Sequence, residues 1–194
     1  NIFQALVLGL VQGITEFLPI SSSGFLILVP EWFGWENQGL SFDAIIHLAT
    51  LAAIVAALWG DVSKIGKSFL SNSKSGLVWQ RLGWMIILAT IPVLAVGYFV
   101  QGFVEASLRS SKIVAVSFII WGIVLYVADR FVSSQAEKKV ENIRIGRAVL
   151  IGLAQVIALI PGTSRSGITI TAGLFSGLNR DTATRFSFLL AIPA

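Results

Sequence analysis

Two short segments of the sequence combine polar side chains that could take part in catalysis with neighbouring glycine and proline residues. The first reads Gln12-Gly-Ile-Thr-Glu16-Phe-Leu-Pro-Ile-Ser-Ser-Ser-Gly24, and the second reads Pro161-Gly-Thr-Ser-Arg165-Ser-Gly167. Glu16 and Arg165 are the charges that fit neither a loop nor a segment end, and such groups in apolar segments usually face a cavity and a partner. We therefore expect both to face a site. The alternative is a buried ion pair that only fixes packing.

Hydroxyl groups surround both breaks, and each run precedes a short apolar stretch. If that stretch is helical, the hydroxyls lie at its positive N-terminus, where backbone N–H groups bind anions. Arg165 would add a planar fork for phosphate oxygens, and the glycines would let the backbone come close. As single residues the hydroxyls are equally typical of caps or interhelix hydrogen bonds. As a set they predict an anion cradle, made of Ser21, Ser22, Ser23, Gly24, Thr163, Ser164, Ser166 and Gly167.

Oxygen ligands and a proton acceptor are also available. Gln12 and Glu16 are four residues apart, hence on one helical face, and could hold a hard divalent cation. Asp43 and His47 have the same spacing and are candidates for proton transfer, although either could serve only as a helix-dipole or interhelical residue. A carboxylate, a cation, a hydroxyl and an arginine are the parts that phosphoryl transfer requires.

The composition indicates a membrane protein. Of 194 residues, 55% are hydrophobic and 12% are charged, whereas a soluble domain has roughly 25% charged residues. The net charge of +4 is therefore weak evidence for nucleic-acid binding, and we expect no nucleic-acid partner. The absence of cysteine from the sequence excludes disulfides and thiolate metal sites. The predicted class is an all-α polytopic membrane protein.

Three segments are predicted to cross the membrane: 44–60, 82–104 and 113–128. Regions 1–30 and 148–179 are apolar but are cut near the middle, so each predicts a broken, re-entrant helical hairpin. Lys and Arg accumulate in 61–81 and 130–147, which are predicted to be cytoplasmic loops. Segment 31–41 has no Lys or Arg and is predicted to face outward.

The two broken regions also resemble each other. A shift of 143 residues places Gly9 on Gly152, Gln12 on Gln155 and Ser21 on Ser164. Three spans lie between the copies, so we expect inverted-topology repeats, the first over about 1–100 and the second from about 112 onward. We expect 1–194 to be one integral-membrane domain, truncated at its C-terminus because it stops within an apolar run.

Through its two motifs, the chain resembles the bacterial undecaprenyl-pyrophosphate phosphatase family of the bacitracin-resistance type. The resemblance covers the whole chain, including Ser41-Phe-Asp and Phe186-Ser-Phe-Leu-Leu-Ala-Ile-Pro193. It implies that Gln12 and Glu16 form the acidic motif, that Ser22 is the essential hydroxyl and that Arg165 binds phosphate. One position departs from the pattern, because Phe25 stands where the family usually has His.

The resemblance implies a hydrolase of the bacterial plasma membrane that converts a polyprenyl pyrophosphate to the monophosphate carrier of cell-wall synthesis. The expected cofactor is Mg²⁺, with Ca²⁺ as the alternative, and the expected site opens to the extracytoplasmic side. Ser22 is either a nucleophile or a hydroxyl that orients water, and the proton goes to Glu16 or His47. Two alternatives are a transporter of a phosphorylated lipid and a homologue impaired by Phe25. A homodimer is left open.

Overall fold

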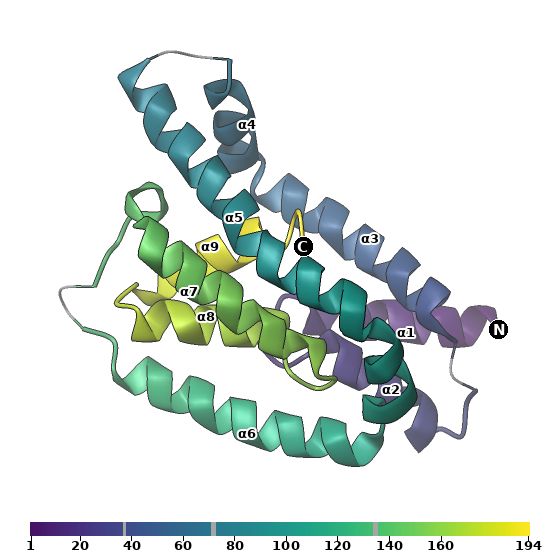
Figure 1. The fold of residues 1–194 in the computed structure, drawn as a ribbon. Helices are drawn as coiled ribbons and strands as arrows, with labels where there is room; N and C mark the ends of the chain where they lie inside the picture. The colour runs from purple at the N-terminus through teal and green to yellow at the C-terminus, as the bar shows by residue number, and fades with distance from the viewer. Residues whose placement is uncertain (37, 71–72, 134–135) are drawn as a thin grey trace.

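The computed structural model describes residues 1–36, 38–70, 73–133 and 136–194, which are almost entirely helical (Figure 1). In chain order its elements are α1 Ile2–Thr15, α2 Ser22–Trp32, α3 Leu40–Ala57, α4 Trp59–Ser68, α5 Lys74–Phe103, the π-helix η1 Val104–Leu108, α6 Ser111–Arg130, the 3-10 turn η2 Val140–Asn142, α7 Ile145–Gln155, the 3-10 turn η3 Val156–Leu159, α8 Arg165–Phe175 and α9 Arg180–Leu190. Within the described ranges the only β-type pairing is an isolated parallel bridge between Glu137 and Leu178. The predicted all-α class is confirmed.

Two helices are long and apolar enough to cross a membrane. They cover Gly76–Leu108, of 33 residues, and Ser111–Arg130, of 20 residues, and they confirm the spans predicted at 82–104 and 113–128. Large apolar side chains on both helices are exposed, including Trp84, Tyr98 and Tyr126. Such a surface suits lipid rather than water, so the polytopic membrane class is confirmed as well.

The span predicted at 44–60 lies mostly in α3, and the chain bends just before the predicted end of the span. Helix α3 ends at Ala57, and α4 continues from Trp59 at an angle of 78°. The sequence turns polar at this point, and Asp61 is drawn inward, where it is buried in an ion pair with Arg185 of α9. The described part of segment 61–81, which was predicted to be a cytoplasmic loop, is therefore mostly helical and belongs to α4 and α5.

Both regions predicted to be broken hairpins are broken where proline and the hydroxyl runs occur. In the first, α1 and α2 flank a turn in which Ser21 has a positive φ of 68°. In the second, α7 and η3 precede a turn in which Gly162 has φ 86°, and α8 follows. Each helix after a break has 11 residues. At 1.5 Å per residue such a helix spans only about 17 Å, which cannot cross a bilayer.

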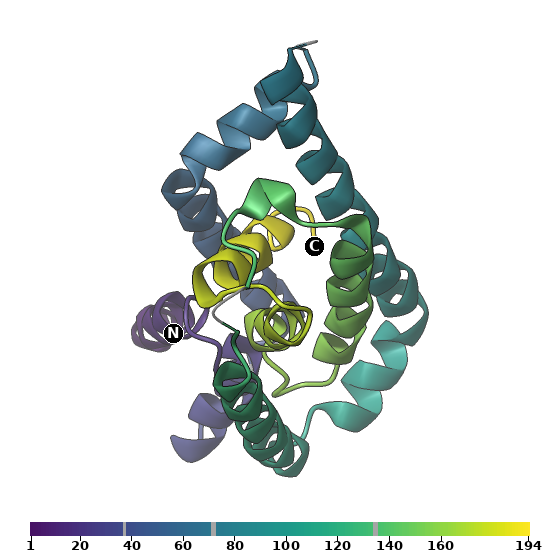
Figure 2. The ribbon, with the colours of Figure 1, turned by 90° about the vertical axis from the view of Figure 1, so that its left-hand side faces the viewer.

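The hairpins approach the centre of the molecule from different sides. In Figure 1 the first enters from the right and the second from the left, while α8 lies inside a ring of other helices in Figure 2. The end of α2 and the start of α3 lie at one end of the molecule, and the starts of α5 and α7 lie toward the other. The inverted relation of the two repeats stays a prediction.

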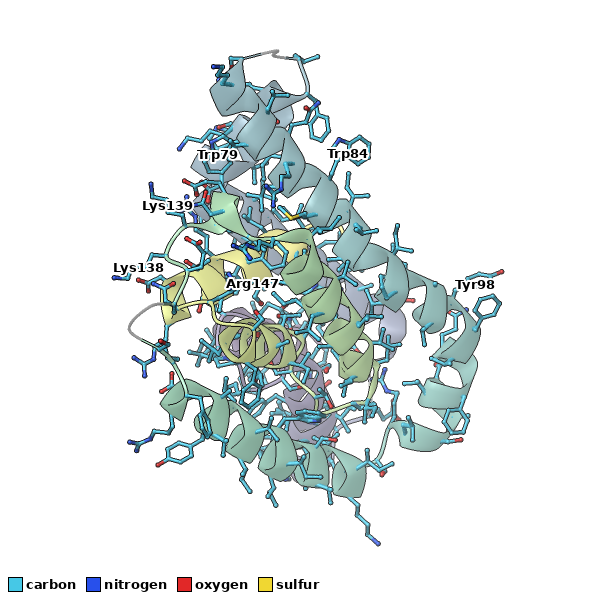
Figure 3. The ribbon with its side chains drawn as sticks, turned by 60° about the vertical axis from the view of Figure 1, so that its left-hand side comes forward. Trp79, Trp84, Tyr98, Lys138, Lys139 and Arg147 are labelled. Atoms are coloured by element: carbon cyan, nitrogen blue, oxygen red, sulfur yellow. The ribbon has the colours of Figure 1, made fainter. Side chains whose placement is uncertain are left out.

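The main core lies around the second hairpin. It joins α5, α7, α8 and α9 through buried side chains that include Leu82, Ile151, Phe186 and Leu189. Gly152 permits the close contact of α7 with α5, since a Cβ there would lie 2.4 Å from the Ala89 carbonyl oxygen. In Figure 3, Lys138 and Lys139 project from the end of the molecule opposite Tyr98. The core therefore holds the second hairpin in place, and the two ends of the molecule differ in charge.

Candidate active site

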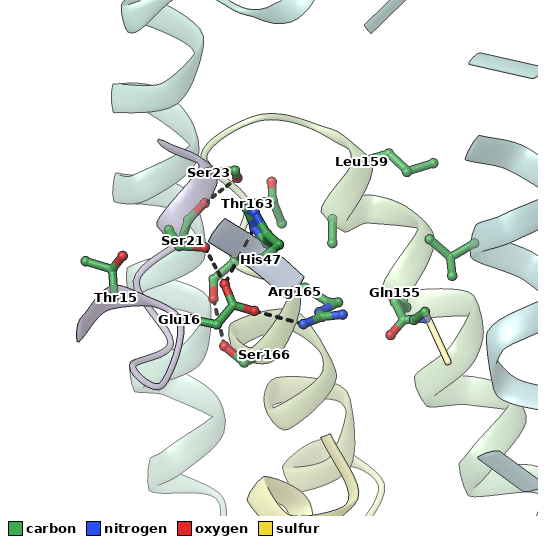
Figure 4. Close-up of a pocket in the computed structure, with 15 residues that line it drawn as sticks. Thr15, Glu16, Ser21, Ser23, His47, Gln155, Leu159, Thr163, Arg165 and Ser166 are labelled. Atoms are coloured by element: carbon green, nitrogen blue, oxygen red, sulfur yellow. Dashed lines mark hydrogen bonds and ion pairs between the residues drawn. The ribbon is translucent and has the colours of Figure 1, made fainter. Parts of the chain in front are cut away.

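The tips of the two hairpins line one cavity of about 270 Å³, to which α3 contributes His47 (Figure 4). The first hairpin supplies Glu16 and the second supplies Arg165, residues 149 apart in sequence. The remaining lining from the predicted cradle consists of hydroxyl side chains: Ser21, Ser22, Ser23, Thr163, Ser164 and Ser166. The fold thus brings most of the predicted site residues together.

Glu16 is the centre of the hydrogen-bond network. It lies directly after α1, and only 10% of its side chain is exposed. Its Oε2 accepts hydrogen bonds from Ser22 Oγ at 2.6 Å and from Gln12 Nε2 at 2.9 Å, and its Oε1 accepts one from Arg165 Nη2 at 2.9 Å. One carboxylate therefore contacts a hydroxyl and a guanidinium from opposite hairpins.

Arg165 is the first residue of α8, so its guanidinium lies beside a helix N-terminus. Its Nη1 donates to the carbonyl oxygen of Ala191, at 3.3 Å, while Nη2 holds Glu16. The side chain remains 30% exposed, and it lines the cavity. A pair that only fixed packing would be closed off, whereas this one presents positive charge to a space of phosphate size.

The hydroxyl groups form two matched pairs. Ser21 and Ser23 are hydrogen-bonded at 3.3 Å, and Ser164 and Ser166 at 3.1 Å. Ser164 also caps α8 by accepting a hydrogen bond from the Gly167 amide, at 3.0 Å, whereas Ser21 makes no such side-chain cap on α2. Thr163 is buried, and its Oγ1 has no hydrogen-bond partner among the described residues.

The side chains of His47 and Asp43 have different contacts. His47 Nδ1 lies 2.7 Å from the backbone oxygen of Asp43, and since a carbonyl only accepts, Nδ1 carries the proton. Nε2 then points an acceptor toward the network, 3.7 Å from Glu16 Oε2. The Asp43 carboxylate instead accepts a hydrogen bond from Arg109, at 3.1 Å, and does not line the cavity. The expected proton-transfer role therefore fits His47 but not the Asp43 side chain.

Two glycines expected in the cradle lie outside the cavity lining. A Cβ on Gly24 would lie 2.5 Å from the Phe118 ring, and one on Gly167 would lie 3.2 Å from the Pro19 carbonyl oxygen. Their amides already donate to Ser21 O and Ser164 Oγ. Gly24 is thus required by packing against α6, and Gly167 by contact with Ser164 and with the turn of the first hairpin. Phe25 belongs to the same apolar contact, with its ring 5.4 Å from that of Phe118.

The oxygen donors of the site can be compared with what a divalent cation needs. No cluster of three acidic or histidine ligands occurs among the described residues, and Glu16 is the carboxylate that lines the cavity. Gln12 is fully buried behind Glu16, and its Oε1 has no hydrogen-bond partner within the described part of the chain. Mg²⁺ commonly binds through one or two carboxylates, waters and substrate phosphates, so this donor set fits it.

Gln155 is a lining residue that the sequence analysis missed. Gln155, the last residue of α7, lines the cavity and has no exposed surface. The repeat offset of 143 pairs it with Gln12, and that correspondence was the signal that could have identified it. Gln155 lies six residues before Pro161 and so outside the motif at the second break.

Comparison with known proteins gives the family. The bacitracin resistance protein BacA family matches residues 5–194. The chain belongs to this family. Among curated relatives, the protein named undecaprenyl-diphosphatase of Teredinibacter turnerae is 48% identical over 199 residues, which cover 100% of this chain and 73% of the relative. The proteins of the same name from Marinobacter nauticus and Hahella chejuensis are 46% and 45% identical, over 100% and 98% of this chain and 73% and 71% of theirs.

Proposed function

We propose that this chain hydrolyses undecaprenyl pyrophosphate to undecaprenyl phosphate and inorganic phosphate in a bacterial plasma membrane. The observation that carries the proposal is the contact of Glu16 with both Ser22 and Arg165 at the tips of two membrane hairpins. The names of the BacA-family relatives supply the substrate. A purely transporting role is not favoured, because the curated relatives are named undecaprenyl-diphosphatase.

The residues divide the reaction between the hairpins. Arg165 exchanges Glu16 for the terminal phosphate, whose oxygens match the guanidinium fork. Ser22 Oγ, already 2.6 Å from Glu16 Oε2, either attacks phosphorus or orients the attacking water, and Glu16 accepts the released proton. In both routes an oxygen-phosphorus bond forms as the bridging bond breaks, and undecaprenyl phosphate leaves with the bridging oxygen. If Ser22 is the nucleophile, water then attacks the phosphoserine, which releases inorganic phosphate and restores the Ser22 hydroxyl.

His47 is the imidazole available at this site. Its Nε2 lies 3.7 Å from Glu16, so it can receive the proton that Glu16 takes up. Phe25 stands where the family usually has His, but its ring packs on Phe118 at the edge of the first hairpin. We therefore propose an active protein in which His47 replaces that imidazole.

Glu16 and Gln12 would hold the expected divalent cation, Mg²⁺ or Ca²⁺. When bound, such a cation neutralises phosphate charge and polarises the phosphoryl oxygens. The support is the donor chemistry, one carboxylate and one buried amide oxygen without a partner among the described residues.

The test of the proposed function is phosphate release from undecaprenyl pyrophosphate by purified protein in detergent. Release that falls after chelation and returns with Mg²⁺ is expected. Release that is unaffected by chelation would contradict the metal role alone, whereas no release in any divalent cation would contradict the hydrolase.

The site is proposed to open to the extracytoplasmic side, because lysine and arginine gather near the opposite end of the molecule. Single cysteines report this directly, since the chain contains none. A cysteine at Gln38 should react with an impermeant reagent in intact cells, and one at Lys138 should not. The reverse pattern would invert the topology. The neighbouring Asn37 lies outside the described residues.

A further inference from the structure

Gln155 is a polar side chain buried in the wall of the cavity. Its side chain is 0% exposed, and neither Nε2 nor Oε1 is hydrogen-bonded to any residue that the structure describes. Buried polar atoms without partners destabilise the folded state, so native proteins contain few of them. A glutamine at this position is explained if its partner is a ligand.

Gln12, which the repeat offset of 143 pairs with Gln155, has different contacts. It is also 0% exposed, but its Nε2 donates to Glu16, at 2.9 Å, and it does not line the cavity. Gln155 has the same burial, makes no such bond within the described chain, and lines the cavity. The two positions correspond in sequence but differ in function.

The location of Gln155 indicates which part of a substrate it meets. In Figure 4 it lies across Arg165 from Glu16, on the side of the cavity where Leu159 lies. The apolar lining of the cavity includes Val93, Ala158 and Leu159. Leu159 also lines a second cavity, of about 500 Å³, which has apolar lining from Gly97, Val100 and Val104 and polar lining from Gln101, Glu105 and Arg109. An apolar chain attached to the headgroup would leave the site in this direction.

We propose that Gln155 binds the phosphate that stays on the lipid, while Glu16, Ser22 and Arg165 act on the terminal phosphate. This inference rests on the proposed function. Nε2 donates to a non-bridging oxygen of the lipid-side phosphate, and Oε1 accepts from water that hydrates the headgroup. Gln155 is then a positioning residue that sets which of the two phosphates reaches Ser22.

The proposal separates three ligands by their chemistry. A prenyl pyrophosphate and a prenyl monophosphate both carry the lipid-side phosphate, whereas inorganic phosphate does not. Removal of the amide should therefore weaken both prenyl ligands by a similar factor and leave inorganic phosphate unaffected. A defect of the Arg165 site, or a general collapse of the cavity, would weaken all three.

The experiment is equilibrium binding of farnesyl pyrophosphate, farnesyl monophosphate and inorganic phosphate to the full chain in detergent. Gln155→Leu should weaken both farnesyl ligands about 10-fold or more, the usual effect of one lost hydrogen bond to a charged group, with no change for inorganic phosphate. Gln155→Glu keeps the shape but adds a negative charge, and should weaken both farnesyl ligands further. Gln80→Leu, on α5 and not in the lining, is the matched control and should change nothing.

Thermal unfolding without ligand distinguishes positioning from packing. Gln155→Leu should unfold at the same or a higher temperature than wild type, because it removes two buried atoms without partners. A lower unfolding temperature, unchanged affinity for the farnesyl ligands, or an equal loss for inorganic phosphate would overturn the proposal. If Gln155→Leu does not fold, Gln155→Met, an unbranched and uncharged side chain of similar length, gives the same comparison of the three ligands.

Turnover distinguishes this inference from the proposed function on which it rests. Failure of wild type to release phosphate from the pyrophosphate would refute the hydrolase. Normal turnover of wild type together with unchanged binding ratios in both variants would refute only the role of Gln155.

Discussion

The first hairpin is less buried than the second. Apolar side chains on one face of α1 are exposed, among them Ile2 at 81% and Leu10 at 66%. In α8 most residues are buried, and α7 to α9 carry much of the main core. The second hairpin is therefore the platform that holds Arg165, and the first brings the carboxylate and hydroxyl to it.

The chemistry is also split between the two hairpins. The repeat offset places Ser22 of one hairpin on Arg165 of the other, so equivalent positions carry a hydroxyl and a guanidinium. Both hairpins retain a hydroxyl pair and a buried glutamine. Neither can act alone, because the acid-base group and the phosphate clamp lie on different copies. Single substitutions can test this division of labour.

The largest effect is expected from Glu16→Gln. The variant keeps the shape but removes both the proton acceptor beside Ser22 and the partner of Arg165. We expect kcat for phosphate release to fall on the order of 10³-fold or more. Glu36→Gln, the same change at an exposed position, is the control and should retain activity. A Glu16→Gln enzyme with near-normal kcat would remove the first hairpin from the chemistry.

Ser22→Ala tests the hydroxyl of the first hairpin. A nucleophile or an orienting hydroxyl acts in the transition state, so kcat should fall on the order of 10²-fold while KM changes little. Steady-state kinetics of phosphate release give both constants. If KM rises and kcat is maintained, Ser22 serves only to bind the substrate.

Arg165→Lys tests the platform. Lysine keeps the charge but cannot hold Ala191 O and a phosphate with a planar fork, so kcat/KM should fall by tens of fold. The same assay measures it, and full activity in the lysine variant would show that a point charge is sufficient. The midpoint of thermal unfolding should change little, because α8 is anchored by the core.

The smallest effect is expected from removing the serine at the N-cap of α8 or of α2. Ser164→Ala removes the side-chain cap of α8 and should lower the free energy of unfolding by about 1 kcal/mol. Ser21→Ala removes no such cap from α2 and should cost less. Thermal or denaturant unfolding in detergent measures both variants. Equal losses of unfolding free energy in the two variants would show that the N-caps of the two hairpins do not differ in their contribution to stability.

The sequence by itself determined the features that depend on local chemistry. Proline, glycine and hydroxyl runs interrupt an apolar helix wherever they occur, so both breaks were predictable. Glu16 and Arg165 stood out because charge is costly in an apolar segment, and the structure joins them at 2.9 Å. The spans at α5 and α6 followed from length and hydropathy alone.

Only the tertiary structure decided which polar groups meet. Asp43 and His47 were both candidates for proton transfer, but the Asp43 carboxylate accepts a hydrogen bond from Arg109, 66 residues away. Gly24 lies against Phe118 rather than in the cavity, and Asp61 bends the chain toward Arg185. Gln12 and Gln155 look alike in sequence, yet one is bonded to Glu16 and the other lines the cavity. Local sequence limits the partners that a side chain can accept, but packing between distant segments selects among them.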